Sequence, residues 1–394
     1  MMNNIRHIIA AFLCTIVAVA AYASPSSKTP EVSFIVVEPG PEVFELEGHA
    51  ALRINGGPMS DFMVTYGVFD FDSPNFIYRF VKGDAEYSMG IIPWRYVSEA
   101  YRREGRTLME YPLALDSVAT ARLMEMIYDN YRPENRYYRY NYVLDNCVTR
   151  PLRIVELAIG DSIIVGEPAS DAAADRTFRQ VMRRYHKNYP WYQFGIDIAL
   201  GSGIDREINS REKTFAPVVV ADQLPGATAG GRPISGEGKI LQQGKESAIL
   251  GPTPWFLTPD AVFWALFVIC TAITIRDIRR GRSTRWLDTA LFGTFGLAGL
   301  LLTFLIFVSL HEATSPNWLY GWLNPFCLIA AVGIWIKKWK NAVICYQFIN
   351  FAVLIALCLL WPLTAQAFNT AFIPLVGCDL MRSASYIYVN KIRK

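Results

Sequence analysis

The sequence predicts an α+β domain outside the cytoplasm, followed by a helical membrane domain of four or five transmembrane helices. Three observations lead to this prediction: an apolar segment opens the 394-residue chain, a long polar stretch with strand and helix patterns follows, and the last third loses nearly all charge in blocks long enough to cross a bilayer. The net charge of +3 is concentrated in the basic loops and tail around those blocks. It therefore reports membrane orientation, and nothing in the composition indicates a nucleic-acid partner.

The N-terminal segment has the pattern of a signal peptide. A short basic start precedes an apolar run at residues 8–20, and residues 21–23 read Ala-Tyr-Ala, a small-residue cleavage pattern. We expect cleavage after Ala23, with an uncleaved anchor as the alternative.

The C-terminal third predicts the membrane crossings and their direction. Basic residues cluster at residues 276–285 and 337–340, which the positive-inside rule places in the cytoplasm. The basic tail favours a fifth crossing by residues 365–381, although this segment is short and contains Pro374, so a re-entrant path is the alternative. The other spans are predicted near residues 255–275, 287–310, 318–336 and 342–363.

This topology and the signal peptide give the same location for the polar stretch, the periplasmic side of the inner (cytoplasmic) membrane, in a multi-pass protein. The Gly- and Pro-rich composition near its end reads as a loop feeding the first span. The predicted division is a signal peptide at 1–23, a periplasmic domain at 24–225, a linker at 226–253, a transmembrane domain at 254–381 and a basic cytoplasmic tail at 382–394.

Within the periplasmic domain, short β-prone runs alternate with helical patterns. The turn residues around Pro58 predict a hairpin, and Asp116 or Ser117 predicts a helix start. Pro151 is tolerated only in a first helical turn, which places another helix start near residues 145–147. The predicted strands are 31–37, 49–55, 61–71, 78–87 and 107–113, the predicted helix is 117–130, and 137–144 is an aromatic-rich run.

Cys147 is the candidate nucleophile. Of seven cysteines it alone lies in the polar stretch, and it stands at the predicted helix start. A helix dipole there stabilises a thiolate, so we expect a lowered pKa. The alternative is a buried apolar cysteine without a chemical role.

His49 is the candidate base, because the other histidines lie in less suitable places. His7 leaves with the signal peptide, His186 follows two arginines in a basic stretch that we expect to be solvated, and His311 lies at the outer membrane rim. His49 opens a strand that can aim the imidazole at the cysteine. Its alternative interpretation is a packed histidine.

A third polar group is needed to fix the tautomer of the histidine. The facing strand offers Thr65, Tyr66 and Asp70, and Tyr66 lies closest to the register that a turn at Pro58 gives. Beside the nucleophile, Asn146 is expected to shape the helix cap.

Candidate binding residues surround these positions. Arg150, Arg153 and Arg53 are candidates for a phosphate headgroup, since guanidinium groups bind phosphate in bidentate geometry. His311 and Asn317 at the outer rim are candidates for a lipid entrance. The sequence has no CxxC pair, no HExxH and no acidic cluster with ligand spacing, so we expect no metal and no cofactor.

Several of these segments carry a family resemblance. They resemble the Lnb-type lipoprotein N-acyltransferases, whose periplasmic domain is similar to circularly permuted papain-like enzymes of the NlpC and lecithin:retinol acyltransferase type. The segments are residues 48–53 (Gly-His-Ala-Ala-Leu-Arg), 66–71 (Tyr-Gly-Val-Phe-Asp-Phe), 133–136 (Pro-Glu-Asn-Arg) and 145–150 (Asp-Asn-Cys-Val-Thr-Arg), and in the membrane part 276–285, 309–311, Asn317 and 322–325.

The resemblance implies a permuted papain-like fold and an acyl transfer. Cys147, deprotonated by His49, would take an acyl chain from a phospholipid as a thioester. It would then pass the chain to the α-amino group of the lipidated N-terminal cysteine of a diacylated lipoprotein. Two alternatives stay open: a Cys-His hydrolase, either a phospholipase or a cell-wall peptidase, and a non-enzymatic envelope scaffold.

Overall fold

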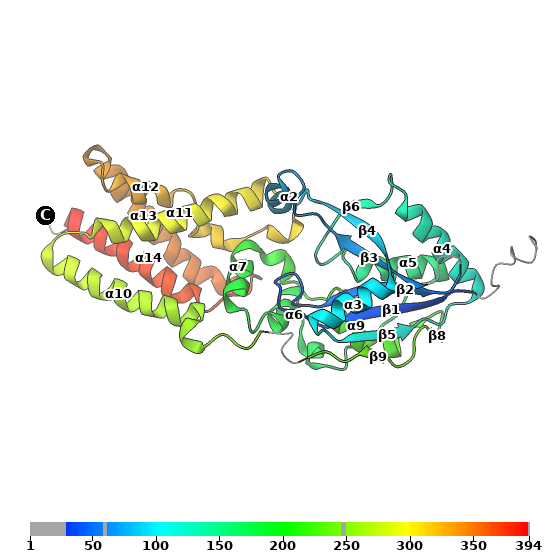
Figure 1. Cartoon of the computed structure of the whole chain (residues 1–394). Coiled ribbons are helices and arrows are strands. Elements are labelled where there is room, and N and C mark those ends of the chain that lie inside the picture. The colour runs from blue at the N-terminus through cyan, green and yellow to red at the C-terminus, as the bar shows by residue number, and fades with distance from the viewer. Residues whose placement is uncertain (1–28, 58–60, 246–249, 393–394) are drawn as a thin grey trace, which may run out of the picture.

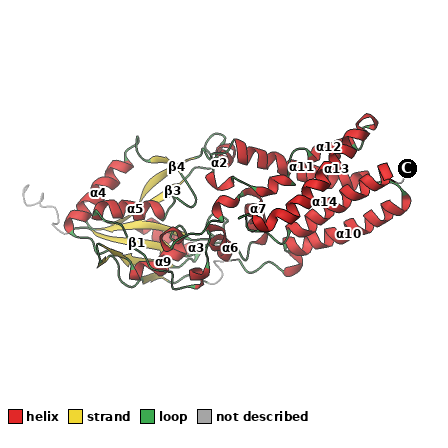
Figure 2. Ribbon diagram, turned by 180° about the vertical axis from the view of Figure 1, so that it is seen from behind, coloured by secondary structure: helices red, strands yellow, loops and turns green. Residues whose placement is uncertain are grey.

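The computed structural model of the chain describes residues 29–57, 61–245 and 250–392 and shows an elongated molecule (Figure 1). A sheet with its covering helices forms one end and a helical bundle forms the other, and Figure 2 shows the strands confined to the first part. The α+β class followed by a helical membrane part is confirmed. The predicted signal peptide lies outside the described residues.

An antiparallel seven-stranded sheet forms the centre of the N-terminal part. Its order is β6-β4-β3-β2-β1-β5-β9, and the antiparallel pairing of β2 with β3 matches the predicted hairpin. The turn predicted at Pro58 lies outside the described residues. The interior strand β1 is buried from its second to its last residue, because helices cover both of its faces. The strands are β1 (Glu31–Val37), β2 (His49–Asn55), β3 (Asp61–Val68), β4 (Glu86–Pro93), β5 (Leu108–Pro112), β6 (Tyr137–Arg139) and β9 (Lys239–Gln242).

Helices on the two faces of the sheet complete its core. On one face α4 (Ser117–Tyr131), α5 (Thr149–Ile159) and α9 (Pro217–Gln223) bury a large apolar cluster, and on the other face α3 (Trp94–Glu104) covers a smaller one. Asp116 caps α4, accepting a hydrogen bond of 2.7 Å from the N–H of Ala119, as its sequence position predicts.

Two sequence expectations for this part are wrong. The strand predicted at 78–87 is instead the helix α2 (Phe76–Lys82), closed by Gly83 at φ +76°, and β4 begins only afterwards. No residue of α2 is buried, so its apolar side chains do not mark a core face. The expected linker at 226–253 contributes β7 (Thr228–Ala229), β8 (Arg232–Pro233) and β9, and β9 adds a strand to the sheet beside β5.

Three helices lie between the sheet and the bundle, and a small apolar core forms around the first of them. They are α6 (Phe178–Tyr185), α7 (Pro190–Ala199) and α8 (Ser210–Lys213). Phe178, Val181 and Phe215 are buried together there. In Figure 1, α6 and α7 lie at the junction with the bundle.

The bundle contains three helices long and apolar enough to cross a membrane among the described residues: Pro259–Arg280, Arg285–Phe307 and Lys337–Leu363. The first two are α10 and α11, and the third includes α13 (Lys340–Leu360). The expected span at 318–336 is not one continuous helix. It contains a 3-10 turn at Trp318–Gly321 and the short helix α12 (Cys327–Gly333), separated by Asn324 and Pro325, because proline has no N–H to continue a helix.

The last helix corrects the predicted C-terminal boundary. α14 (Phe372–Ile387) holds Pro374 in its first turn, where proline is tolerated, and continues through residue 381 without a break. Arg382, expected in a basic tail, is buried and pairs with Asp277 of α10 at 3.0 Å and Asp288 of α11 at 2.6 Å. α14 runs along the bundle from the junction to the distal end (Figure 1), but with 16 residues it is not among the three described helices long enough to cross a membrane.

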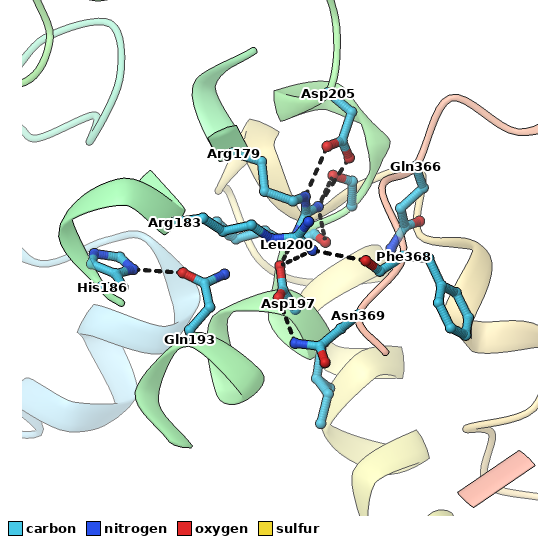
Figure 3. Close-up of polar contacts among 12 residues, drawn as sticks. Arg179, Arg183, His186, Gln193, Asp197, Leu200, Asp205, Gln366, Phe368 and Asn369 are labelled. Carbon is cyan, nitrogen blue, oxygen red and sulfur yellow. Dashed lines mark hydrogen bonds and ion pairs between the residues drawn. The ribbon is translucent and has the colours of Figure 1, made fainter. Parts of the chain in front are cut away.

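A buried polar cluster joins the bundle to the periplasmic part (Figure 3). Arg179 of α6 pairs with Asp197 of α7 at 2.7 Å and with Asp205 at 2.8 Å, and all three side chains are almost fully buried. Asn369, in the loop before α14, donates to Asp197 at 2.7 Å, and Arg183 donates to the carbonyl of Phe368 at 3.2 Å. These contacts hold the two parts in one arrangement.

Candidate active site

A cavity of 690 Å³ lies where the periplasmic part meets the bundle. Its volume is within the range of roughly 300–1,000 Å³ typical of small-molecule sites. The periplasmic wall includes His49 and Cys147, and the bundle contributes Leu301 and Leu305 of α11 together with Thr314. The two predicted catalytic residues therefore share a cavity that is closed on one side by a membrane-spanning helix.

Asn146 fixes the backbone around Cys147. Its Oδ1 accepts hydrogen bonds from the N–H groups of Val148 at 2.9 Å and Thr149 at 3.0 Å, which caps α5. Its Nδ2 donates to the carbonyls of Tyr142 and Phe215, both at 2.8 Å. Asn146 thus fixes the backbone on both sides of Cys147.

The Cys147 thiol is buried, and this reverses the expected direction of its pKa. Burial raises the pKa to about 11, although hydrogen bonds from the backbone of Ala50 and the side chain of Tyr140 act in the opposite direction. The expectation of a thiolate stabilised by the helix dipole is wrong, because the desolvation of the buried thiol outweighs these hydrogen bonds. At neutral pH the group is a thiol.

Thr65, and not Tyr66, is the hydrogen-bond partner of His49. The His49 Nε2 lies 2.7 Å from the hydroxyl of Thr65. Thr65 is opposite Ala51 in the β2–β3 ladder, so its side chain lies on the same face as those of Ala51 and His49, whereas Tyr66 points to the other face. The Tyr66 hydroxyl donates to Asn130 at 2.9 Å, which corrects the expectation that it orients the histidine.

Two glycines permit this arrangement. Gly48 has φ +84°, and a side chain there would collide with the carbonyl of Val37, so the turn into His49 requires glycine. Gly67 has φ +87° and lies under the ring of Tyr140, which a Cβ would meet at 3.0 Å.

The His49 imidazole is neutral at physiological pH. Desolvation, with a smaller effect of the Arg106 charge, lowers its pKa from 6.5 to about 4. Arg106 is itself held by Glu45 at 2.7 Å. A neutral imidazole and a neutral thiol are therefore the resting forms, rather than an ion pair.

Cys147 and His49 line the same cavity and are connected through Ala50. The thiol is hydrogen-bonded to the backbone of Ala50, the residue that follows His49 in β2. Within the described part of the chain, the contacts of the thiol are to Ala50 and Tyr140, while the imidazole contacts Thr65. The Nδ1 atom of His49 is the ring nitrogen that Thr65 leaves available.

The structure adds a second polar group to the cavity wall that sequence reasoning missed. His186, expected in solvent, is 1% exposed, with its Nδ1 2.8 Å from the Oε1 of Gln193 and its Nε2 3.4 Å from the carboxylate of Glu47. The hydroxyl of Tyr142 donates to the other oxygen of Glu47. Only the position of Glu47, two residues before His49, hinted at this group in the sequence.

Two family models account for most of the chain. Residues 20–183 match the Lnb N-terminal periplasmic domain and residues 252–394 match the Lnb transmembrane domain. The chain belongs to the Lnb family. No match was found among curated proteins or among solved structures. It is thus a multi-pass membrane protein whose N-terminal domain is periplasmic.

The arginines predicted to bind phosphate do not face the cavity of this Lnb-family protein. Arg150 forms a bidentate pair with Asp145, with a shortest distance of 2.5 Å, and lies over the ring of Tyr138. Arg53 pairs with Asp61 at 2.7 Å and also with Glu110. Both arginines therefore have structural contacts. Arg153 is exposed on α5 and is not among the residues lining the cavity.

Of the two rim residues, only His311 reaches the cavity of the Lnb fold. Its Nε2 lies 2.8 Å from the carbonyl of Phe80, and both residues line the cavity. Asn317 is buried outside it, donating to the carbonyl of Ile198 at 2.9 Å and accepting from the N–H of Leu319. Asn317 therefore links the bundle to α7 instead of lining a lipid entrance.

An exposed apolar surface continues from α11 onto α2, beside the cavity. Ile77 and Tyr78 of α2 are 78% and 55% exposed, and Tyr78 packs its ring against Phe304 of α11. Two other α2 residues, Phe80 and Val81, line the cavity. In this Lnb-family protein the apolar surface of a membrane helix thus extends to the mouth of the site.

Proposed function

We propose that this protein is a lipoprotein N-acyltransferase of the inner membrane. It takes an acyl chain from a phospholipid onto Cys147 as a thioester and transfers it to the α-amino group of the lipidated N-terminal cysteine of a diacylated lipoprotein. The observation that carries this proposal is one cavity whose lining includes a thiol, an imidazole and two leucines of the membrane helix α11.

In the first half-reaction, Cys147 attacks the ester carbonyl of the phospholipid. The thiol proton passes to Nδ1 of His49, the sulfur–carbon bond forms and the ester carbon–oxygen bond breaks. The imidazolium then protonates the departing alkoxide, which leaves as a lysophospholipid. The step uses the tautomer in which Nε2–H donates to the Thr65 hydroxyl, 2.7 Å away, and Nδ1 is unprotonated.

The tetrahedral intermediate develops negative charge close to two donors. The hydroxyl of Tyr140 and the N–H of Ala50 contact the sulfur in the resting protein. Donors fixed beforehand at such a position stabilise the charge without reorganisation.

In the second half-reaction, the amine attacks the thioester carbonyl. The carbon–nitrogen bond forms, the carbon–sulfur bond breaks, and His49 transfers a proton from nitrogen to sulfur, which restores the thiol. Family membership supports a lipoprotein acceptor, and the apolar surface of α2 and α11 supports a lipid donor.

Reconstitution of the full chain in phospholipid vesicles tests the proposal. With a diacylated lipopeptide as acceptor, intact-mass spectrometry should detect one acyl chain on Cys147 and a triacylated product. Cys147→Ala should abolish both, while Cys345→Ala, at an exposed cysteine of α13, should leave both unchanged. Product formation by Cys147→Ala, or release of free fatty acid with no acylated lipopeptide, would overturn the proposal.

A further inference from the structure

Glu47 is a buried carboxylate without a strong cationic partner. It is 8% exposed, and the only ion pair that includes it in the described part of the chain is the 3.4 Å contact with His186. Its Oε1 atom is buried without a hydrogen bond. Burying a carboxylate without full compensation costs free energy, so such a group points to a ligand that supplies the missing donor.

The surroundings of Glu47 suit a cation. Tyr142, Tyr192 and Phe215 line the cavity around the Glu47–His186 pair. The Tyr192 ring lies 4.9 Å from the imidazole of His186, and the Tyr142 ring lies 6.2 Å from that of Phe215. Aromatic faces beside a carboxylate are the pattern by which proteins bind ammonium groups.

The same carboxylate is close to the reaction centre. Glu47 lies three residues before Ala50, whose backbone is hydrogen-bonded to the thiol, and its charge acts to raise the pKa of Cys147. Because Glu47 and Cys147 line the same cavity, a group bound at Glu47 shares that cavity with the sulfur.

We propose that Glu47, His186 and the aromatic side chains around them form a subsite for a primary ammonium group. The inference rests on the function proposed above and deepens it. Two substrates of that reaction carry such a group. The acceptor lipoprotein has it as its α-amino group, and an ethanolamine phospholipid has it in its headgroup.

For the acceptor, the subsite also supplies a proton acceptor. The ammonium group gives one proton to Glu47 and becomes a nucleophilic amine, which attacks the thioester carbonyl. The second proton passes through His49 to the departing sulfur, and Glu47 later releases its proton to solvent. One amide and one thiol result for each ammonium and thioester consumed.

The test separates the two half-reactions in the reconstituted full chain. Wild type and Glu47→Gln are first loaded from phosphatidylglycerol vesicles, whose headgroup has no amine. The acyl-enzyme is then exposed either to a diacylated lipopeptide with a free N-terminal amine or to hydroxylamine, a neutral nucleophile. Loading is also compared between phosphatidylglycerol and phosphatidylethanolamine vesicles.

If the acceptor ammonium binds here, Glu47→Gln slows transfer to the lipopeptide by about 100-fold and leaves hydroxylamine cleavage unchanged. If the headgroup ammonium binds here, the variant slows loading from phosphatidylethanolamine only. The ratio of the two nucleophiles is measured on the loaded protein, so a misfolded fraction does not affect it. Glu104→Gln, at another carboxylate of the cavity wall, should match wild type in every arm.

The subsite would be overturned if wild type and Glu47→Gln had equal rates in every arm. It would also be overturned if the variant lost as much rate with hydroxylamine as with the lipopeptide, or lost loading equally from both lipids. Tyr142→Phe provides a second variant should Glu47→Gln not fold, because it removes only the hydroxyl that donates to Glu47, and it should shift the same ratio by a smaller factor. A wild-type protein that forms no thioester would overturn the proposed function, and the subsite with it.

Discussion

Burial sets the protonation states of the two proposed catalytic side chains. Desolvation raises the pKa of the Cys147 thiol to about 11 and lowers the pKa of the His49 imidazole to about 4, so both are neutral when the site is empty of substrate. A thiolate then forms only as the proton moves to His49 during attack. An exported thiol kept in this form reacts slowly with oxidants, since the thiolate is the reactive species.

Replacement of Thr65 tests which residue orients the base. Thr65→Val removes the hydroxyl bonded to His49 Nε2, and we expect thioester formation to fall about 10- to 100-fold, as for the loss of a buried hydrogen bond of 1–3 kcal/mol. Thr65→Ser should retain most of the rate. Tyr66→Phe is the matched control, because its hydroxyl contacts Asn130, and a larger loss in this variant than in Thr65→Val would contradict the assignment.

The lowered pKa of His49 predicts a pH-dependent stability. The unfolded chain binds a proton near pH 6.5, whereas the folded chain binds it only near pH 4. The free energy of unfolding is therefore highest, as far as His49 affects it, above about pH 6.5. It decreases as the pH falls toward 4, by at most about 3 kcal/mol. Thermal unfolding of wild type and His49→Gln at a series of pH values measures this. A decrease of the same size in both proteins would show that His49 is not its origin.

At the scale of elements, α2 has an unusual composition for its position. None of its residues is fully buried, and Val81 packs against the core of the bundle. Its backbone is tied to the end of α11, where the Ser309 hydroxyl donates to the carbonyl of Val81 at 3.1 Å and the N–H of Leu310 donates to that of Lys82 at 2.7 Å. A short apolar helix held there suits the outer leaflet of the bilayer.

Polar substitution in α2 tests its contact with lipid. Ile77→Glu should lower acyl transfer from vesicle phospholipid several-fold, because the charge opposes insertion, but it should not affect transfer from a water-soluble short-chain donor. Ile164→Glu changes a similarly exposed isoleucine, 66% against 78%, outside the cavity and the bundle, and should have no effect. Equal losses with both donors in Ile77→Glu would indicate a folding defect and contradict a membrane contact.

Local patterns in the sequence were sufficient for several elements. The β-branched run at β1, the antiparallel pairing of β2 with β3 and the Asp116 cap depend on neighbouring residues, and each was predicted. The strand partner of His49 was not, because a shift of one residue turns Thr65 away and Tyr66 inward. The strand predicted at 78–87 was also wrong, because the apolar residues of the exposed helix α2 have the same composition as those of a buried strand.

The second polar group depended on tertiary structure entirely. Glu47 and His186 are far apart in the chain, and the basic residues before His186 suggested solvent exposure. The helix α7 packs against His186 and buries it, with Tyr192 on its ring. No pattern within either segment indicates that pairing.

At the scale of the whole molecule, the two parts are joined by buried charge as well as by apolar packing. Asp197 lies at the centre, since it accepts from Arg179 of α6, from Asn369 of the bundle and from Arg183 at 3.1 Å (Figure 3). The geometry of the cavity depends on this junction, because its walls come from both parts.

Arg179→Met tests the junction. It leaves Asp197 and Asp205 buried without their main partner, and we expect a loss of about 3–5 kcal/mol in the free energy of unfolding. Hydrogen exchange should increase in α7 and in the loop around Asn369. Arg176→Met is the control, because Arg176 is 78% exposed and its pair with Glu207 is a surface contact. Wild-type exchange in Arg179→Met would show that the cluster does not couple the two parts.

The shared cavity also constrains how such a chain can evolve. His49 and Cys147 face Leu301, Leu305 and Thr314, so a substitution that reshapes one wall changes the fit of residues encoded more than 150 positions away. If the periplasmic part were combined with the bundle of a relative, the two sides of the cavity would not have evolved together. We therefore expect functional chimaeras to be rare unless both halves come from close relatives, so that the two are inherited as a single unit.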